Sequence, residues 1–122
     1  MESAERPWGA WFVLDEGSGY KVKRIDVRSQ QRLSYQTHEQ RSEHWYVVQG
    51  TATCLIDGET VVVPVGGSID VPVGAAHRIS NLHDDDLSIV EVQRGPYLGE
   101  DDIVRLEDDY GREGDESDSA SQ

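Results

Sequence analysis

The stretch Gln36-Thr37-His38-Glu39-Gln40-Arg41-Ser42-Glu43 decides how the chain is interpreted. Side chains two residues apart on a strand point to the same face, so Gln36 and His38 are expected to project together. Glu43 follows after a bend, at the start of the next predicted strand. Two neutral donors and one carboxylate from adjacent strands suit a divalent ion such as zinc, manganese, iron, cobalt or nickel.

A second stretch, Pro72-Val73-Gly74-Ala75-Ala76-His77, supplies a further imidazole. Its proline and glycine are typical of a tight turn that places His77 at the start of a strand. We therefore expect four metal ligands: Gln36, His38, Glu43 and His77. His44 should point away from the ligand face because side chains alternate along a strand, and His83 should lie in a solvated loop.

The rest of the sequence predicts an all-β sandwich or barrel in one domain spanning 1–112. Short runs rich in β-branched residues begin at Tyr20, and Asp57-Gly58 between two apolar runs is a strong hairpin signal. No segment before residue 100 has sustained helical periodicity. The segment from 100 to 112 could form a short helix or a final strand. Residues 113–122 are acidic and rich in serine, which predicts a disordered tail.

The composition of the chain argues against some classes of binding partner and favours others. The net charge of −13 argues against nucleic acid as a ligand, and no apolar stretch is long enough to cross a bilayer. Cys54 is the one cysteine, and the first residues lack the features of a signal peptide, so we expect a cytoplasmic protein. Six of the 11 basic residues fall in one segment: Lys21, Lys23, Arg24, Arg28, Arg32 and Arg41. They indicate either an anionic small molecule as ligand or ordinary solvated strand faces.

The two metal-ligand stretches resemble the two motifs of the cupin family. Gln36, His38 and Glu43 stand at the ligand places of the first motif, whose closing glycine is Gly50. Its opening glycine place holds Gln30, a departure that should affect only turn geometry. The second motif is filled at every place by Gly66, Pro72, Gly74, His77 and Asn81. This resemblance implies a double-stranded β-helix (a cupin/jelly-roll barrel) with one divalent metal ion, and a homodimer that covers exposed strand edges.

Within the cupins, the chain resembles the type II mannose-6-phosphate isomerases. In that family the domain usually lies at the C-terminus of bifunctional mannose-1-phosphate guanylyltransferase/mannose-6-phosphate isomerase enzymes. Guanylyltransferase activity is not expected from this chain. The match lies in residues 6–9, 20–24, 32–38, 41–45, 77–81, 91–93 and 97–103, and Gln36 is itself part of the pattern. The family commonly has imidazoles where this chain has Glu39 and Gln40, and a tyrosine where it has Trp11. The loss of the imidazoles puts proton transfer or substrate contact at those positions in doubt.

The resemblance implies interconversion of mannose 6-phosphate and fructose 6-phosphate through an enediol, with a phosphorylated sugar as substrate. A base must move the proton, and Lys23 and Glu91 are the leading candidates. Cations should hold the phosphate, and the candidates are Arg24, Arg41 and Arg78 together with Lys23. The apolar parity of residues 20–27 changes along the run, which predicts a bulge there. Two alternatives remain: a non-catalytic cupin that binds a metal and a sugar, or another cupin enzyme such as an iron dioxygenase.

Overall fold

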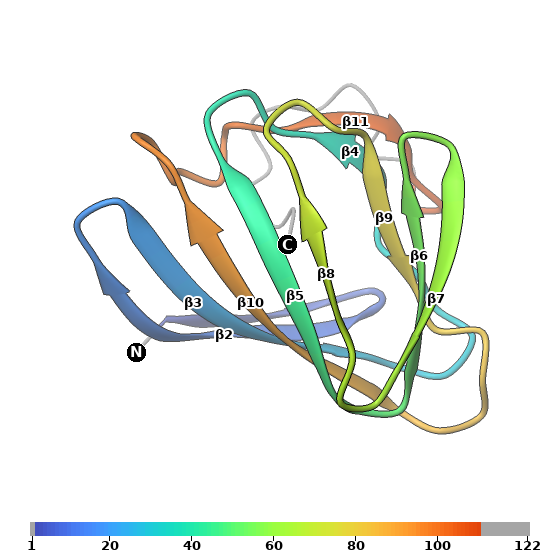
Figure 1. The fold of residues 1–122 in the computed structure, drawn as a ribbon. Coiled ribbons are helices and arrows are strands. Elements are labelled where there is room, and N and C mark those ends of the chain that lie inside the picture. Colours follow the sequence, from blue (N-terminus) through green and yellow to red (C-terminus); the bar gives the residue numbers. More distant parts are fainter. Residues whose placement is uncertain (1, 111–122) are drawn as a thin grey trace.

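The computed structural model describes residues 2–110, which form two antiparallel sheets facing each other (Figure 1). The larger sheet has the strand order β1-β2-β3-β10-β5-β8. Its strands are β1 (Ser3–Arg6), β2 (Gly9–Gly17), β3 (Tyr20–Val27), β5 (Ser42–Gln49), β8 (Ser68–Val71) and β10 (Leu87–Arg94). This all-β arrangement confirms the predicted fold class.

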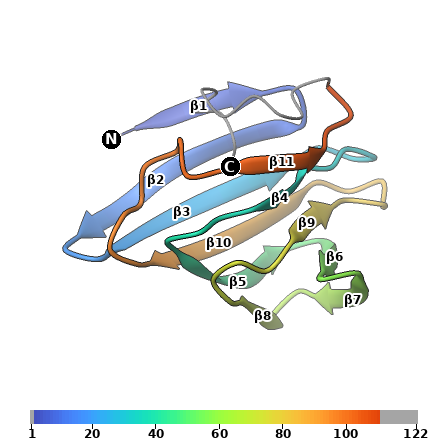
Figure 2. The ribbon, with the colours of Figure 1, turned by 90° about the horizontal axis from the view of Figure 1, so that it is seen from above.

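The smaller sheet has the order β11-β4-β9-β6-β7. Its strands are β4 (Tyr35–Thr37), β6 (Thr51–Ile56), β7 (Glu59–Pro64), β9 (His77–Ser80) and β11 (Val104–Glu107). Figure 2 shows β11 running alongside β4, so the segment that the sequence left open between helix and strand forms a strand. Within residues 2–110 no helix is long and apolar enough to cross a membrane. The predicted tail at 113–122 and the domain boundary at 112 lie outside the described residues.

Two turns follow directly from local sequence. Asp57 and Gly58 both have positive φ, 47° and 82°, as a two-residue hairpin turn between β6 and β7 requires, so the predicted hairpin is confirmed. Gln30 has φ 64°, a left-handed backbone that costs a non-glycine residue about 1–2 kcal/mol. Its side-chain amide donates to the carbonyls of Leu82 and His83, which offsets part of that cost. Gln30 therefore adopts a left-handed backbone that a glycine would take without this cost.

The space between the sheets is divided into two zones along the strands. The same four strands contribute apolar side chains at one end and polar side chains at the other. The apolar zone contains Ile25 and Val27 of β3, Trp45 and Val47 of β5, Ile79 of β9, and Leu87 and Ile89 of β10. The polar zone contains Lys23 of β3, Glu43 of β5, His77 of β9, and Glu91 and Gln93 of β10.

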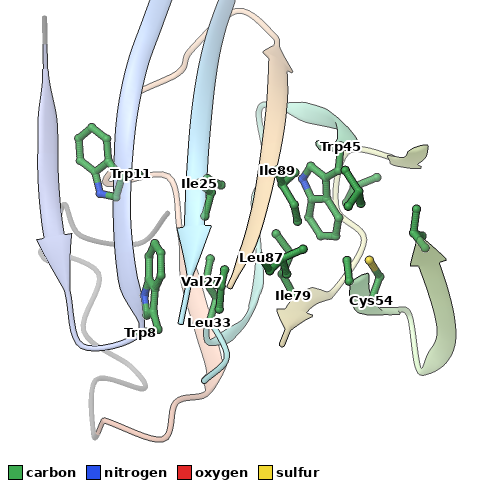
Figure 3. Close-up of a cluster of buried hydrophobic side chains, with 14 of the residues drawn as sticks. Trp8, Trp11, Ile25, Val27, Leu33, Trp45, Cys54, Ile79, Leu87 and Ile89 are labelled. Atoms are coloured by element: carbon green, nitrogen blue, oxygen red, sulfur yellow. The ribbon is translucent and has the colours of Figure 1, made fainter. Parts of the chain in front are cut away.

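The apolar zone is the hydrophobic core, and Figure 3 shows its labelled side chains gathered between the strands. Full burial of each large apolar side chain stabilises the fold by roughly 1.5–3 kcal/mol. The register carries this packing across the larger sheet, because Ile25 of β3 lies opposite Ile89 of β10, which lies opposite Val47 of β5. The polar zone begins one inward position further along, where Lys23 lies opposite Glu91.

The predicted bulge in residues 20–27 is wrong. The pairing of β3 with β10 is continuous, and the irregularity lies in the neighbouring strand β2, between Val13 and Asp15. Lys23, Ile25 and Val27 share the inward face, whereas Val22 lies on the other face and is only half-buried. The apolar pattern was misleading because an inward position of this strand carries a lysine.

Candidate metal centre

Three side chains from both sheets converge in the polar zone. His38 follows the end of β4, Glu43 lies near the start of β5, and His77 is the first residue of β9. One ligand atom from each lies within 4.8 Å of the others, and all three residues are buried. The structure therefore brings together the three ligands that the spacing of the two motifs predicted.

Hydrogen bonds orient both imidazoles with Nε2 toward the cluster. Nδ1 of His77 donates to the Ala75 carbonyl at 3.0 Å, and Nδ1 of His38 contacts the Asp102 carbonyl. A bond of this kind fixes the tautomer and leaves Nε2 with the lone pair that a metal needs. Burial, reinforced by the neighbouring Arg41, lowers the pKa of His38 to about 3, and burial also lowers the pKa of His77. Both rings are therefore neutral at physiological pH.

Glu43 is the charged member of the cluster. Its carboxylate accepts hydrogen bonds from Nε1 of Trp45 at 2.8 Å and from Nε of Arg41 at 2.9 Å. Burial opposes ionisation, but the Arg41 guanidinium, the nearby imidazoles and the Trp45 bond together hold the pKa of Glu43 down at about 2. The side chain is thus a carboxylate at every pH at which the protein is expected to work.

The fourth predicted ligand, Gln36, is buried in β4 directly opposite His77 of β9. Its amide nitrogen donates to Oγ of Ser34 at 2.9 Å, so its amide oxygen is the atom that could coordinate a metal. Gln36 as a ligand stays a prediction, because the structure fixes its place beside His77 and not its bond to an ion.

The cluster fits a divalent ion of the zinc, manganese, iron, cobalt or nickel type. Two neutral imidazoles and a carboxylate are donors that these ions accept. Among residues 2–110, Nε2 of His77 is buried without a hydrogen-bond partner, and a bound cation would satisfy it. One rearrangement is required, because Nη2 of Arg41 lies 3.0 Å from Nε2 of His38. That guanidinium must turn away from the nitrogen for His38 to coordinate.

Both candidates for the base lie next to the cluster. Lys23 and Glu91 are fully buried and lie opposite each other on β3 and β10. Burial and the nearby negative charge of Glu43 raise the pKa of Glu91 to about 8, even though Arg41 and Lys23 act in the opposite direction. Oε1 of Glu91 accepts a hydrogen bond from Gln93, and Oε2 has no partner among the described residues. Glu91 is therefore a carboxyl group able to hold or release a proton near neutral pH.

Lys23 is engaged by other groups. Its ammonium group forms an ion pair with Glu100 and lies 4.4 Å from the centre of the Trp11 ring. Trp11, which stands where the family commonly has a tyrosine, therefore packs against a buried cation. Arg41 connects this pair to the metal cluster, because Nη1 of Arg41 lies 3.8 Å from Oε2 of Glu100.

The structure places Arg24 and Arg78 away from the metal cluster, and their expected role in substrate binding stays a prediction. Arg24 lies on the outer face of β3, half-exposed, where it pairs with Asp26 at 3.2 Å. Arg78 alternates with the inward-facing His77 on β9, and its guanidinium bonds the Leu33 carbonyl at 2.9 Å and Glu107. Strand alternation explains both placements.

Two residues of the site were missed by sequence reasoning. Glu100 and Asp102 lie in the irregular connection between β10 and β11, where no periodic pattern indicates which side chains point inward. Asp102 supplies the carbonyl that contacts His38, and its carboxylate accepts the backbone N–H groups of Glu39 and Gln40 at 3.0 and 2.9 Å. The resemblance over residues 97–103 was the signal that could have found them.

His44 and the loop histidine lie where they were expected. His44 is exposed on the outer face of β5 and bonds Asp70 at 2.6 Å, and His83 is exposed in the loop before β10. Glu39 and Gln40 are also exposed. The imidazoles that the family commonly has at 39 and 40 would therefore point to solvent here, away from the metal cluster.

Comparisons with known proteins agree with this geometry. The family model described as "Mannose-6-phosphate isomerase C-terminal" matches residues 1–108. The chain is 48% identical over 107 residues to the mannose-1-phosphate guanylyltransferase ManC of Salmonella typhimurium, covering 88% of this chain and 22% of that protein. The chain thus spans about a fifth of the length of the curated relatives it matches.

Solved structures show the same fold at low identity. The oxalate decarboxylase of Lactobacillus farciminis superposes with a TM-score of 0.75 at 20% identity, over 86% of this chain and 33% of that one. A sugar phosphate isomerase of the cupin superfamily from Silicibacter pomeroyi superposes with a TM-score of 0.64 at 16% identity, over 70% of this chain and 58% of that one. The fold is that of the cupins.

Proposed function

The chain belongs to the mannose-6-phosphate isomerase C-terminal family, and from this premise we propose that it is a metal-dependent isomerase interconverting mannose 6-phosphate and fructose 6-phosphate. The observation that carries the proposal is the position of Glu91, a buried carboxyl group whose pKa is raised to about 8, in the same polar zone as the three metal ligands. An aldose–ketose isomerase needs a group that moves a proton between two carbons beside a site that stabilises an oxyanion.

His38, Glu43 and His77, with Gln36 as the fourth ligand, would hold the ion. A bound divalent metal would polarise the sugar carbonyl and stabilise the negative charge that develops on its oxygen. The donor set suits zinc, manganese, cobalt, nickel or iron.

Glu91 is the group we assign to proton transfer. Proton transfer is most efficient when the pKa of the group lies near the working pH, and burial brings Glu91 into that range. The carboxylate removes the proton from carbon 2 of the open-chain aldose, and the aldehyde oxygen gains a proton to give the enediol. The carboxylic acid then returns its proton to carbon 1 while the hydroxyl on carbon 2 loses its proton, which gives the ketose; the reverse direction follows the same steps. Its Oε2 is buried and without a partner among residues 2–110, so this oxygen is available for the transferred proton.

Lys23 and Arg41 supply positive charge beside Glu91, because Lys23 is its cross-strand neighbour and both cations act on its pKa. The Lys23 ammonium is ion-paired, so we assign it to charge stabilisation and not to proton abstraction. Arg41 contacts both the ligand Glu43 and the ligand His38, so it couples the charge of the substrate to the metal cluster.

A coupled assay with mannose 6-phosphate on metal-loaded protein tests the proposal. We expect turnover that a chelator abolishes and that returning the metal restores. Glu91→Gln should bind metal like the parent protein and lose most of its activity, whereas Glu39→Gln, an exposed change, should retain activity. If the metal-loaded protein shows no turnover, the alternative of a non-catalytic cupin that binds metal and sugar becomes the better account.

A further inference from the structure

The connection from β10 to β11, residues 95–103, crosses from the larger sheet to the smaller one (Figures 1 and 2), and its Glu100 and Asp102 contact Lys23 and His38 in the polar zone. It is fixed near both of its ends. The Gly95 N–H donates to the Gly19 carbonyl at 3.1 Å, and a Cβ at Gly95 would lie 2.0 Å from the Gln40 carbonyl oxygen. At the other end the Asp102 carboxylate accepts two backbone N–H groups. Between these points, Glu100 ties the connection to the interior.

The Glu100 carboxylate lies against two fully buried cations. One oxygen forms the ion pair with Lys23, and the other lies 3.8 Å from Nη1 of Arg41. The side chains of Lys23 and Arg41 are 0% exposed, and that of Glu100 is 11% exposed. Glu100 is therefore a partly solvated group covering two cations that have no exposure of their own.

The carboxylate fits this position incompletely. Nη1 of Arg41 is buried and has no hydrogen-bond partner among residues 2–110, although a buried donor without a partner is costly. At 3.8 Å the second oxygen of Glu100 is too far away for a hydrogen bond. A phosphate group is larger, carries up to two negative charges and has three terminal oxygens. Such a group could accept from Lys23 and from Arg41 at the same time.

We propose that Lys23 and Arg41 form the subsite for the phosphate of the substrate, and that the carboxylate of Glu100 occupies this subsite until the phosphate displaces it. The proposal rests on the proposed function for the identity of the substrate, but phosphate binding itself requires neither the metal nor turnover. Displacement would move the middle of the connection outward between its two fixed ends and open the polar zone to the sugar.

Titration calorimetry with inorganic phosphate on chelator-treated protein tests this subsite. Glu100→Gln removes the competing charge and keeps the shape of the side chain, so it should bind phosphate at least tenfold more tightly than the parent protein. Asp101→Asn is the matched control. Asp101 accepts a hydrogen bond from Tyr97 within the same connection, and no contact joins it to Lys23 or Arg41 among residues 2–110. It should bind phosphate like the parent protein. Equal or weaker binding by Glu100→Gln would overturn the proposal.

A second measurement uses the unmodified protein and does not depend on how the variant folds. Amide hydrogen exchange of residues 97–101 should become faster when phosphate binds, because the Glu100 anchor is released. Phosphate binding with unchanged exchange in this stretch would refute displacement. Both readouts are independent of the isomerase assay, so tighter phosphate binding without turnover would retain the subsite and reject the reaction.

Discussion

Replacing Glu91 by glutamine should stabilise the metal-free protein far more at pH 8 than at pH 5. The pKa of Glu91 is about 8 in the folded protein and near its ordinary value of 4.5 in the unfolded chain. Between these values the folded protein keeps a proton that the unfolded chain releases. The stability contributed by the protonated carboxyl is therefore fully present below pH 4.5 and is lost as the pH rises to 8. Glutamine does not titrate and keeps its contribution throughout.

The size of the effect follows from the same two values. At about 1.4 kcal/mol per pH unit, the whole interval corresponds to roughly 5 kcal/mol, of which about 3 kcal/mol falls between pH 5 and pH 8. Urea unfolding of both proteins at pH 5, 6, 7 and 8, with a chelator present, measures the difference in free energy of unfolding. The contributions of the histidines cancel in that difference because both proteins contain them. A difference that stays within 1 kcal/mol from pH 5 to pH 8 would refute this account of Glu91.

Three further perturbations test the site and the fold. His77→Ala should remove most of the bound metal by elemental analysis, whereas His44→Ala, on the outer face, should retain it; equal metal content in both would contradict the ligand set. Gly50→Ala should lower the free energy of unfolding by at least about 2 kcal/mol, because φ is +80° and the new Cβ would lie 2.6 Å from the Asp86 carbonyl oxygen. Deleting residues 113–122 should leave the melting temperature unchanged, and a fall of several degrees would show that this acidic stretch contributes to the fold.

The metal cluster was predictable because its geometry is local. A few consecutive residues are enough to predict two side chains on the same face of a strand. A few are also enough to predict the Pro-Gly turn before His77. Only the convergence of the two stretches needed the fold, and the motif spacing supplied it. His38, Glu43 and His77 accordingly lie within 4.8 Å of one another, as measured between their ligand atoms.

The rest of the site was harder to predict because polar residues occupy inward positions. Lys23 and Glu91 face the interior, so the rule that apolar residues mark the inward face gave a false bulge in β3. Arg24 and Arg78 were chosen for their charge, and strand alternation then placed both on outer faces. Glu100 lies in a connection without periodicity, so no pattern of alternating residues predicts that its side chain reaches the interior.

The division of the interior into an apolar and a polar zone affects how the function of such a protein can change during evolution. Each of the four strands that line both zones has its apolar core residues at one end and the residues of the candidate site at the other, so a substitution in the polar zone need not disturb the packing of the apolar zone. Selection can then alter the reaction without first rebuilding the scaffold. An oxalate decarboxylase shares this fold at 20% identity and a TM-score of 0.75, and one fold can carry different reactions.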